Sequence, residues 1–104
     1  MNLSFYKFIN KDEFIKYLVN PNLVLCKRNY ISRFCDICGL LTPEGHLEAA
    51  CVIQKLESNK LFIKLFEVSS SNYRKGIGTR FFNNIIKYLY NSETGEINLN
   101  RVER

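Results

Sequence analysis

The sequence has no tryptophan, two prolines, five glycines and one histidine among its 104 residues. It also lacks any run near the ~20 consecutive apolar residues that a membrane-spanning helix needs, so no membrane function is expected. The N-terminus, MNLSFYKFINKDEF, becomes charged too early for a secretory signal peptide, which predicts a cytoplasmic location. Thiols stay reduced in that compartment, so the four cysteines are not expected to form disulfides.

What is present is the composition of an ordinary globular protein, with 46% hydrophobic and 24% charged residues. This length predicts one domain, residues 1–104. Lys and Arg exceed Asp and Glu by five, which fits either an anionic ligand or a solvated basic surface. The cations are spread along the chain and form no block, so nucleic acid is not expected as a partner.

Apolar periodicity and turn residues predict an α+β fold with the element order β-α-β-β-β-α-β. The strands are expected at 3–6, 34–41, 46–56, 61–68 and 96–102, and the helices between Asn10 and Asn20 and between Gly78 and Asn91. Residues 23–58 are β-like throughout, and the turns at 42–45 and 58–60 are typical of antiparallel hairpins. The sheet is therefore expected to be mixed and mainly antiparallel.

The start of the first helix has its own signature. Asn10 is followed three residues later by Glu13, a pair that caps helix N-termini, and Pro21 ends the same helix. The last strand, at 96–102, would leave an exposed sheet edge, so a homodimer through this strand is a further expectation.

A loop with two glycines joins the strand at 61–68 to the second helix. Gly76 and Gly78 let the backbone approach a ligand closely, because neither has a Cβ. N–H groups in the first turn of a helix have no acceptor within it and, together with the helix dipole, attract anions. Arg74 and Lys75 add positive charge. The loop therefore predicts a phosphate-binding cradle.

Two common phosphate-binding motifs do not fit this loop. The third glycine of a dinucleotide-binding fingerprint is replaced by Phe81. The lysine of a Walker A motif is missing, since Gly78 is followed directly by Thr79. Glycine at a strand–helix turn also occurs for turn geometry alone, so the two glycines by themselves leave ligand binding open.

The segment FEVSSSNYRKGIGTRFFNNIIKYL, residues 66–89, resembles the acyl-CoA-binding segment of GNAT-type N-acetyltransferases. In that family a strand ending in Val precedes a short polar stretch and an Arg/Gln-x-x-Gly-x-Gly/Ala motif that opens a helix. Val68, Gly76 and Gly78 match this pattern, and the preceding element order matches as well. Tyr73 stands where the family has Arg or Gln.

The resemblance implies an enzyme that transfers an acetyl group from acetyl-CoA to a primary amine of a protein or small molecule by direct attack. It implies a cofactor site formed by Phe66, Val68, Tyr73, Arg74, Lys75, Gly76, Ile77, Gly78 and Thr79. The Val68 amide is the implied oxyanion donor. Glu67 is the candidate general base, with the alternative that it only pairs with Lys64 or solvent.

Two alternatives to this enzyme stay open. Members of the family usually continue with a further helix and two strands, which these 104 residues do not include. The chain can therefore also be an inactive GNAT-like module that binds CoA or another protein. The second alternative is a small zinc-stabilised nucleic-acid-binding domain. It rests on Cys35 and Cys38, which have the spacing of a zinc knuckle.

No metal site is expected, because a structural zinc site usually has two such pairs and only one is present. On a strand, Cys35 and Cys38 would also point to opposite faces. Small buried hydrophobic side chains are the more usual role for such cysteines.

Overall fold

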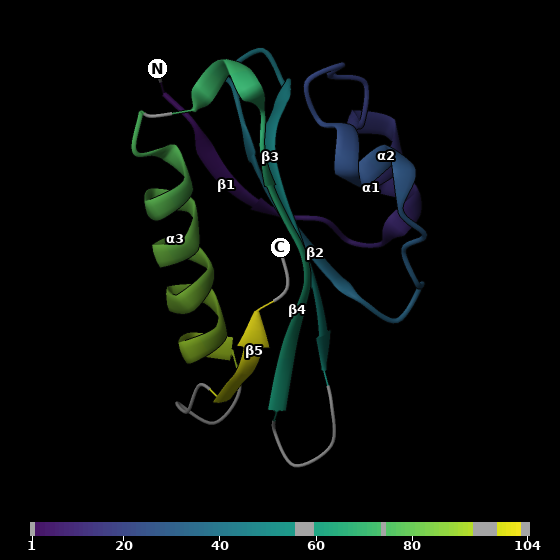
Figure 1. The fold of residues 1–104 in the computed structure, drawn as a ribbon, viewed down its shortest axis with the longest axis vertical. Coiled ribbons are helices and arrows are strands. Elements are labelled where there is room, and N and C mark those ends of the chain that lie inside the picture. Colours follow the sequence, from purple (N-terminus) through teal and green to yellow (C-terminus); the bar gives the residue numbers. More distant parts are fainter. Residues whose placement is uncertain (1, 56–59, 74, 93–97, 103–104) are drawn as a thin grey trace.

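The computed structural model describes residues 2–55, 60–73, 75–92 and 98–102. Its strands are β1 Ser4–Lys7, β2 Asp36–Leu41, β3 Leu47–Lys55, β4 Lys60–Val68 and β5 Asn98–Val102, and its helices are α1 Lys11–Tyr17, α2 Val24–Arg28 and α3 Ile77–Ser92. The strands form one sheet in sequence order, with helices on both faces (Figure 1). β1 to β4 are antiparallel neighbours and β5 is parallel to β4. The predicted mixed, mainly antiparallel α+β fold is confirmed.

The sheet separates two hydrophobic cores, one under α3 and one under α1 and α2 (Figure 1). β3 supplies both, because successive side chains of a strand point to opposite faces. Cys51 and Ile53 lie in the core that contains Phe81 of α3, whereas Ala50 and Val52 lie in the other core. The buried middle of β3 therefore fixes the positions of both helical layers.

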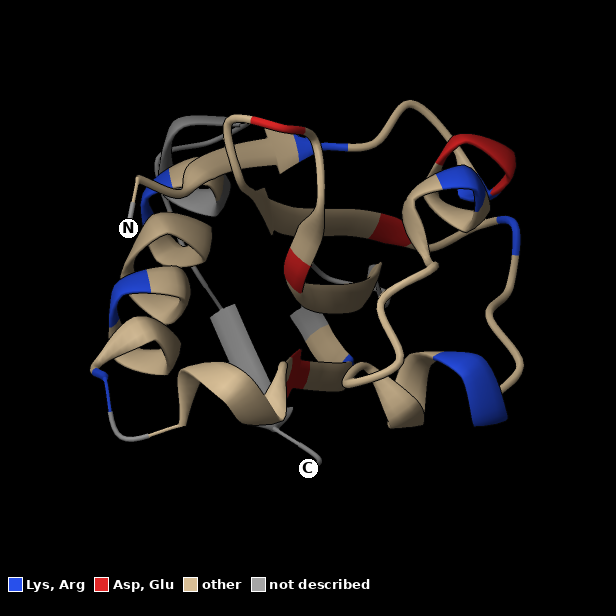
Figure 2. Ribbon diagram, turned by 90° about the horizontal axis from the view of Figure 1, so that it is seen from above, with Lys and Arg blue, Asp and Glu red and all other residues tan. Residues whose placement is uncertain are grey.

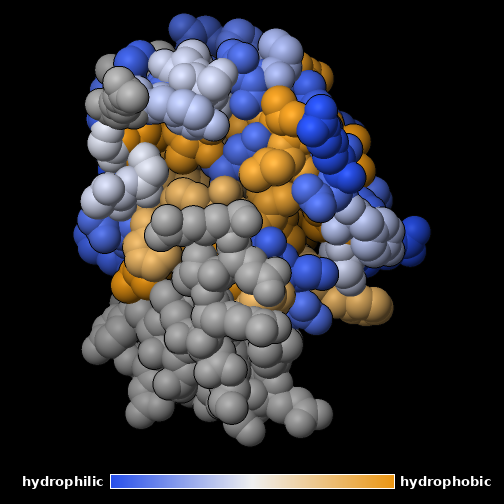
Figure 3. Space-filling model, viewed as in Figure 1, coloured by the Kyte–Doolittle hydropathy of each residue, from blue (hydrophilic) through white to orange (hydrophobic). Residues whose placement is uncertain are grey.

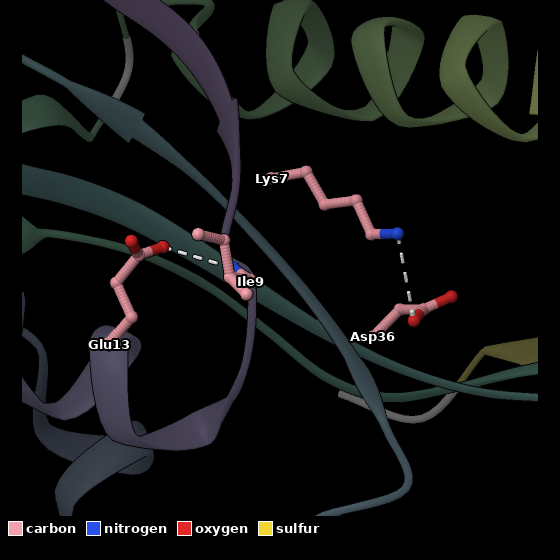
Figure 4. A network of polar contacts seen from close by, with 4 residues as sticks. All are labelled: Lys7, Ile9, Glu13 and Asp36. Carbon is pink, nitrogen blue, oxygen red and sulfur yellow. Dashed lines mark hydrogen bonds and ion pairs between the residues drawn. The ribbon is translucent and has the colours of Figure 1, made fainter.

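α1 begins where the sequence predicts. The Asn10 side chain accepts a hydrogen bond from the Glu13 N–H at 2.9 Å. Glu13 Oε1 in turn accepts the Ile9 N–H at 3.0 Å, as Figure 4 shows. The same view shows an ion pair between Lys7 and Asp36, which links β1 to β2. The Lys7 ammonium lies 4.0 Å from a carboxylate oxygen of Asp36. These contacts hold the start of α1 close to the end of β1.

α2 is a helix that the sequence analysis missed, since it interpreted residues 23–58 as β-like throughout. The helix has only five residues, and Leu23, the residue before it at the N-cap position, provides no side-chain cap. A helix this short is marginal from local signals alone, so its stability has to come from tertiary contacts. The strand expected at 34–41 accordingly begins two residues later, at Asp36.

β4 has two irregularities that matter for the site. A register shift between Val52 and Ile53 of β3 leaves Lys64 as an extra residue in β4, which is a β-bulge. β5 pairs only with residues 60–63 of β4. In the described part of the chain no strand lies beside residues 64–68 on that side, so β4 and β5 separate there (Figure 1).

Two sequence predictions reach beyond the described ranges. The predicted turn at 58–60 lies outside them except for residue 60, and residues 96–97 of the predicted last strand lie outside them as well. The homodimer through that strand stays a prediction. Among the described residues, no helix has the length and apolar character needed to cross a membrane.

Candidate functional site

The loop between β4 and α3 is held on its inner side by buried polar groups. A 3-10 turn spans Ser70–Asn72, and both Ser69 and Asn72 are buried. The Ser69 N–H donates to the Glu48 carbonyl at 2.9 Å, and Asn72 Nδ2 donates to Ser69 Oγ at 2.7 Å. The loop is therefore anchored to β3 before it reaches α3.

Glu48 of β3 is the centre of this network. Its Oε2 accepts hydrogen bonds from Ser69 Oγ at 2.8 Å, Asn72 Nδ2 at 3.3 Å and Asn20 Nδ2 at 2.8 Å. Asn20 lies in the connection between α1 and α2, and its Nδ2 also donates to the Leu47 carbonyl at 3.0 Å. One carboxylate thus fixes both the loop before α3 and the connection before α2.

Gly76, immediately before α3, has a φ of +72°, which L side chains rarely adopt. A Cβ at this position would meet no heavy atom of the described residues within 4 Å, so those residues leave the surface there open. The Gly76 carbonyl accepts the Arg80 N–H at 3.1 Å, the first bond of the helix. The amides of Ile77, Gly78 and Thr79 have no acceptor within the helix. With no acidic side chain in the first turn, this end of α3 suits an anion.

Gly78 brings the start of α3 close to the end of β4. A Cβ at Gly78 would lie 3.7 Å from Val68 Cγ2 and 4.0 Å from Phe66 Cε1. The Phe66 ring stacks on Phe81 with 5.3 Å between centroids, and it also meets Phe82 edge-on at 6.2 Å. The side chains of Phe66 and Val68 therefore pack against α3, and their backbone is the part that a ligand at the β4 edge can contact.

The other predicted cofactor residues lie around the same loop. Lys75 is exposed and Tyr73 is 63% exposed, but the Tyr73 N–H already donates to the Ser70 carbonyl at 3.3 Å. Arg74 lies outside the described residues. Arg80 donates from Nη2 to the Leu3 carbonyl at 3.1 Å, which ties α3 to the residues before β1.

Glu67 does not have the surroundings that the sequence analysis expected. Its side chain is 7% exposed, and Oε2 accepts the N–H groups of Val24 at 2.6 Å and Leu25 at 2.9 Å. Its Oε1 accepts the Cys26 N–H at 3.0 Å. The expected pairing with Lys64 or solvent is wrong: the carboxylate caps α2, and both oxygens that a general base would use are engaged by backbone.

A cavity of about 640 Å³ lies between β4 and α2. β4 contributes Lys64, Leu65 and Phe66, and α2 with the segment after it contributes Leu25 and residues 29–31. Figure 3 shows hydrophobic side chains gathered between the two helical flanks, on the face presented in Figure 1. Phe66 therefore borders the cavity on one side and packs against α3 on the other.

Several solved acetyltransferases share the fold of this chain. An aminoglycoside acetyltransferase from an uncultured soil metagenomic sample matches 99% of this chain and 80% of its own, with a TM-score of 0.65 and 15% identity. IAA acetyltransferase from Bacillus cereus matches over 85% of this chain, with a TM-score of 0.62 and 14% identity. An acetyltransferase of the GNAT family from Staphylococcus aureus matches over 85%, with a TM-score of 0.57 and 13% identity.

The chain has the GNAT-type N-acetyltransferase fold. It spans 58% of the length of the Bacillus cereus protein and 66% of the Staphylococcus aureus protein. No protein-family model and no curated protein matches the sequence. Within this GNAT fold, the described residues Phe66, Val68 and 75–79 from the predicted cofactor set lie around the junction of β4 and α3.

The cysteines of the GNAT fold lie in its two cores. Burial raises the pKa of Cys38 to about 12, and it also raises the pKa of the Cys26 and Cys51 thiols. Such thiols stay protonated at neutral pH. Cys35 packs against the core under α1 and α2, whereas Cys38 belongs to the core under α3. The described part of the chain contains no group of three or more His, Cys, Asp or Glu side chains placed to hold a metal.

Proposed function

We propose that this protein binds acetyl-CoA and transfers the acetyl group to a primary amine. The observation that supports the proposal most strongly is the open start of α3. Gly76 has a positive φ and free space at its Cβ position, and the helix opens without an acidic side chain. Three first-turn amides without intrahelical acceptors suit the pyrophosphate of CoA, because an anion at a helix N-terminus is bound by N–H groups and the helix dipole.

Acetyl-CoA would supply a thioester whose carbonyl carbon accepts the amine. The edge of β4 left uncovered by β5 offers backbone groups of residues 66–68 to the pantetheine arm, in the manner of an added strand. The Val68 amide is our candidate donor for the oxyanion that develops on the thioester carbonyl. Phe66 and Val68 keep this stretch rigid, because their side chains pack against α3.

The amine would enter through the cavity beside β4. An ammonium group there loses a proton to water, and its nitrogen then attacks the thioester carbonyl carbon. The new C–N bond forms and the C–S bond then breaks, and the proton that the nitrogen loses as it becomes an amide is taken up by the leaving thiolate, which gives free CoA. We assign Glu67 to anchoring α2 and not to this proton transfer, because three backbone N–H groups already occupy its carboxylate.

Titration calorimetry with CoA tests the cradle, using Gly76→Asp and Gly45→Asp as a matched pair. Gly45 also has a positive φ, +84°, and free space at its Cβ position, but it lies in the turn between β2 and β3. Both variants carry the same backbone strain, and only Gly76→Asp places a carboxylate at the start of α3. We expect CoA affinity to fall about tenfold or more in Gly76→Asp, a change of about 1.4 kcal/mol, and to be unchanged in Gly45→Asp.

The outcomes separate the proposed enzyme from its alternatives. An absence of heat from the unmodified protein at millimolar CoA, or equal affinities of Gly76→Asp and Gly45→Asp, would overturn the cradle. CoA binding without acetyl transfer to any amine in a broad panel would instead indicate a non-enzymatic CoA-binding module.

A further inference from the structure

We infer that the acceptor amine carries an anionic group, and that Lys64 binds it on the wall of the cavity between β4 and α2. The inference rests on the proposed function and concerns the same site. It predicts an acceptor with an apolar body and a carboxylate, as in an amino acid with a free α-amine.

Lys64 owes its place to the β-bulge in β4. It is the extra residue between Ile63 and Leu65, and it lines the cavity together with Leu65 and Phe66. In the described ranges no carboxylate lies within ion-pair distance of Lys64. The cavity wall therefore presents a cation that a ligand can pair with.

The surroundings of the cavity strengthen this positive character. α2 has no acidic residue in its first turn and ends in Lys27 and Arg28, which Figure 2 shows as a basic helix end. Lys11 places its ammonium 4.6 Å from the centroid of the Tyr30 ring at the cavity border. The carboxylate of Glu67 is buried under three amides of α2. A polyamine would meet repulsion here, whereas a carboxylate would be attracted.

Apart from Lys64 and Asn29, the residues that line the cavity are aliphatic or aromatic. Leu25, Ile31 and Leu65 contribute hydrophobic surface, and Tyr30 is 80% exposed beside them. The volume of about 640 Å³ is within the range of small-molecule pockets. A ring or aliphatic chain can fill this surface while its carboxylate reaches Lys64.

Binding of L-phenylalanine and L-phenylalaninamide tests the inference directly. The two probes share the ring and the α-amine, and only the first has a carboxylate. We would measure affinities by NMR titration of the free protein and of its CoA complex, at about pH 6, where both amines are protonated. At low ionic strength we expect phenylalanine to bind about threefold to fivefold more tightly, which is the range for an exposed ion pair.

Lys64→Met should abolish this preference, and Lys64→Glu should reverse it. The control is Lys87→Met, which removes an exposed lysine on α3 and should leave the preference unchanged. The preference should also weaken with added salt.

Equal affinity for the two probes, an unchanged preference in Lys64→Met, or no binding of either probe would overturn the inference. If the protein binds CoA but shows no such preference, the proposed function stands and only the inference about Lys64 fails. If the protein prefers phenylalanine but binds no CoA, the proposed function fails and the inferred anion-binding cavity stands.

Discussion

Glu67 on β4 and Glu48 on β3 each accept several hydrogen bonds that hold neighbouring segments in place. The carboxylate oxygens of Glu67 accept hydrogen bonds from three backbone N–H groups, at 2.6, 2.9 and 3.0 Å. Hydrogen bonds to a charged group are worth about 1.5–3 kcal/mol each, so this contact stabilises α2 more than its five residues can by themselves. One side chain on β4 thus stabilises a helix that lies about 40 residues before it in the chain.

Glu67→Gln tests this role at the residue scale. The glutamine keeps one acceptor oxygen and turns the other position into an amide donor that faces a backbone N–H. We expect the free energy of unfolding, measured with urea, to fall by about 2 kcal/mol. Glu44→Gln, in the exposed turn before β3, is the control and should change it little. An unchanged stability, together with a displaced acid limb of the kcat profile, would return Glu67 to the role of general base.

Sequence reasoning succeeded at residues whose conformation is set locally. The Asn10–Glu13 cap spans three residues, and the glycine at position 76 follows from a backbone conformation that other residues avoid. Glu67 and the amides that it binds are 41 to 43 residues apart. The local sequence around Glu67 or around α2 contains no pattern that indicates this long-range contact, so the contact could not be predicted.

At the scale of elements, periodic segments were predictable and the aperiodic one was not. α3 has a continuous apolar face that buries Phe81 and Ile85, and the strands alternate between two cores. α2 has neither the length for a helical period nor a capping side chain, and its residues read as β-like by composition. Short elements held by distant partners are therefore where sequence patterns fail in this fold.

Glu48 gives the element-scale prediction, because it joins β3 to the connections before α2 and α3. Glu48→Ala removes the carboxylate that accepts from Ser69 Oγ, and it removes one of the two acceptors of Asn72 Nδ2, which keeps its bond to Ser69 Oγ. We expect amide hydrogens of residues 69–72 to exchange faster and the CoA dissociation constant to rise. Stability should fall by about 2–3 kcal/mol, the cost of unsatisfied buried polar groups.

Glu48→Gln is the matched variant, since its amide oxygen can still accept in place of Oε2. It should retain most of the protection and of the CoA affinity. Equal CoA affinity in Glu48→Ala and the unmodified protein would show that the cofactor loop does not depend on this network.

At the scale of the whole molecule, the opening between β4 and β5 follows from topology. A hairpin meander is followed by a crossover through α3, which returns β5 parallel to β4 and pairs it only with residues 60–63. The predicted element order contained this crossover, and the GNAT fold is confirmed at identities of 13–15% to the solved proteins. The β-bulge at Lys64 was not predictable, because it depends on how β3 and β4 register across the finished sheet.

The two cores also predict how the molecule responds to alkaline pH. Cys26, Cys38 and Cys51 are buried, and burial raises the pKa of each thiol above the ordinary value of 9.0. The folded protein thus holds these protons where the unfolded chain has released them. Stability is unaffected below about pH 9 and falls as the pH rises above it, by up to about 1.4 kcal/mol per pH unit for each thiol.

Urea unfolding under reducing conditions, between about pH 8 and about pH 11, measures this slope. Tyrosine and lysine side chains titrate in the same range, so the comparison must be between variants in which they are identical. Cys38→Ala removes one buried thiol and should make the decline less steep, whereas Cys35→Ala removes a half-buried one and should change it less. If stability fell with pH equally steeply in Cys38→Ala and in the unmodified protein, the loss at alkaline pH would come from other groups. The reason is that a thiol with the same pKa in the folded and unfolded states contributes nothing to the pH dependence of stability.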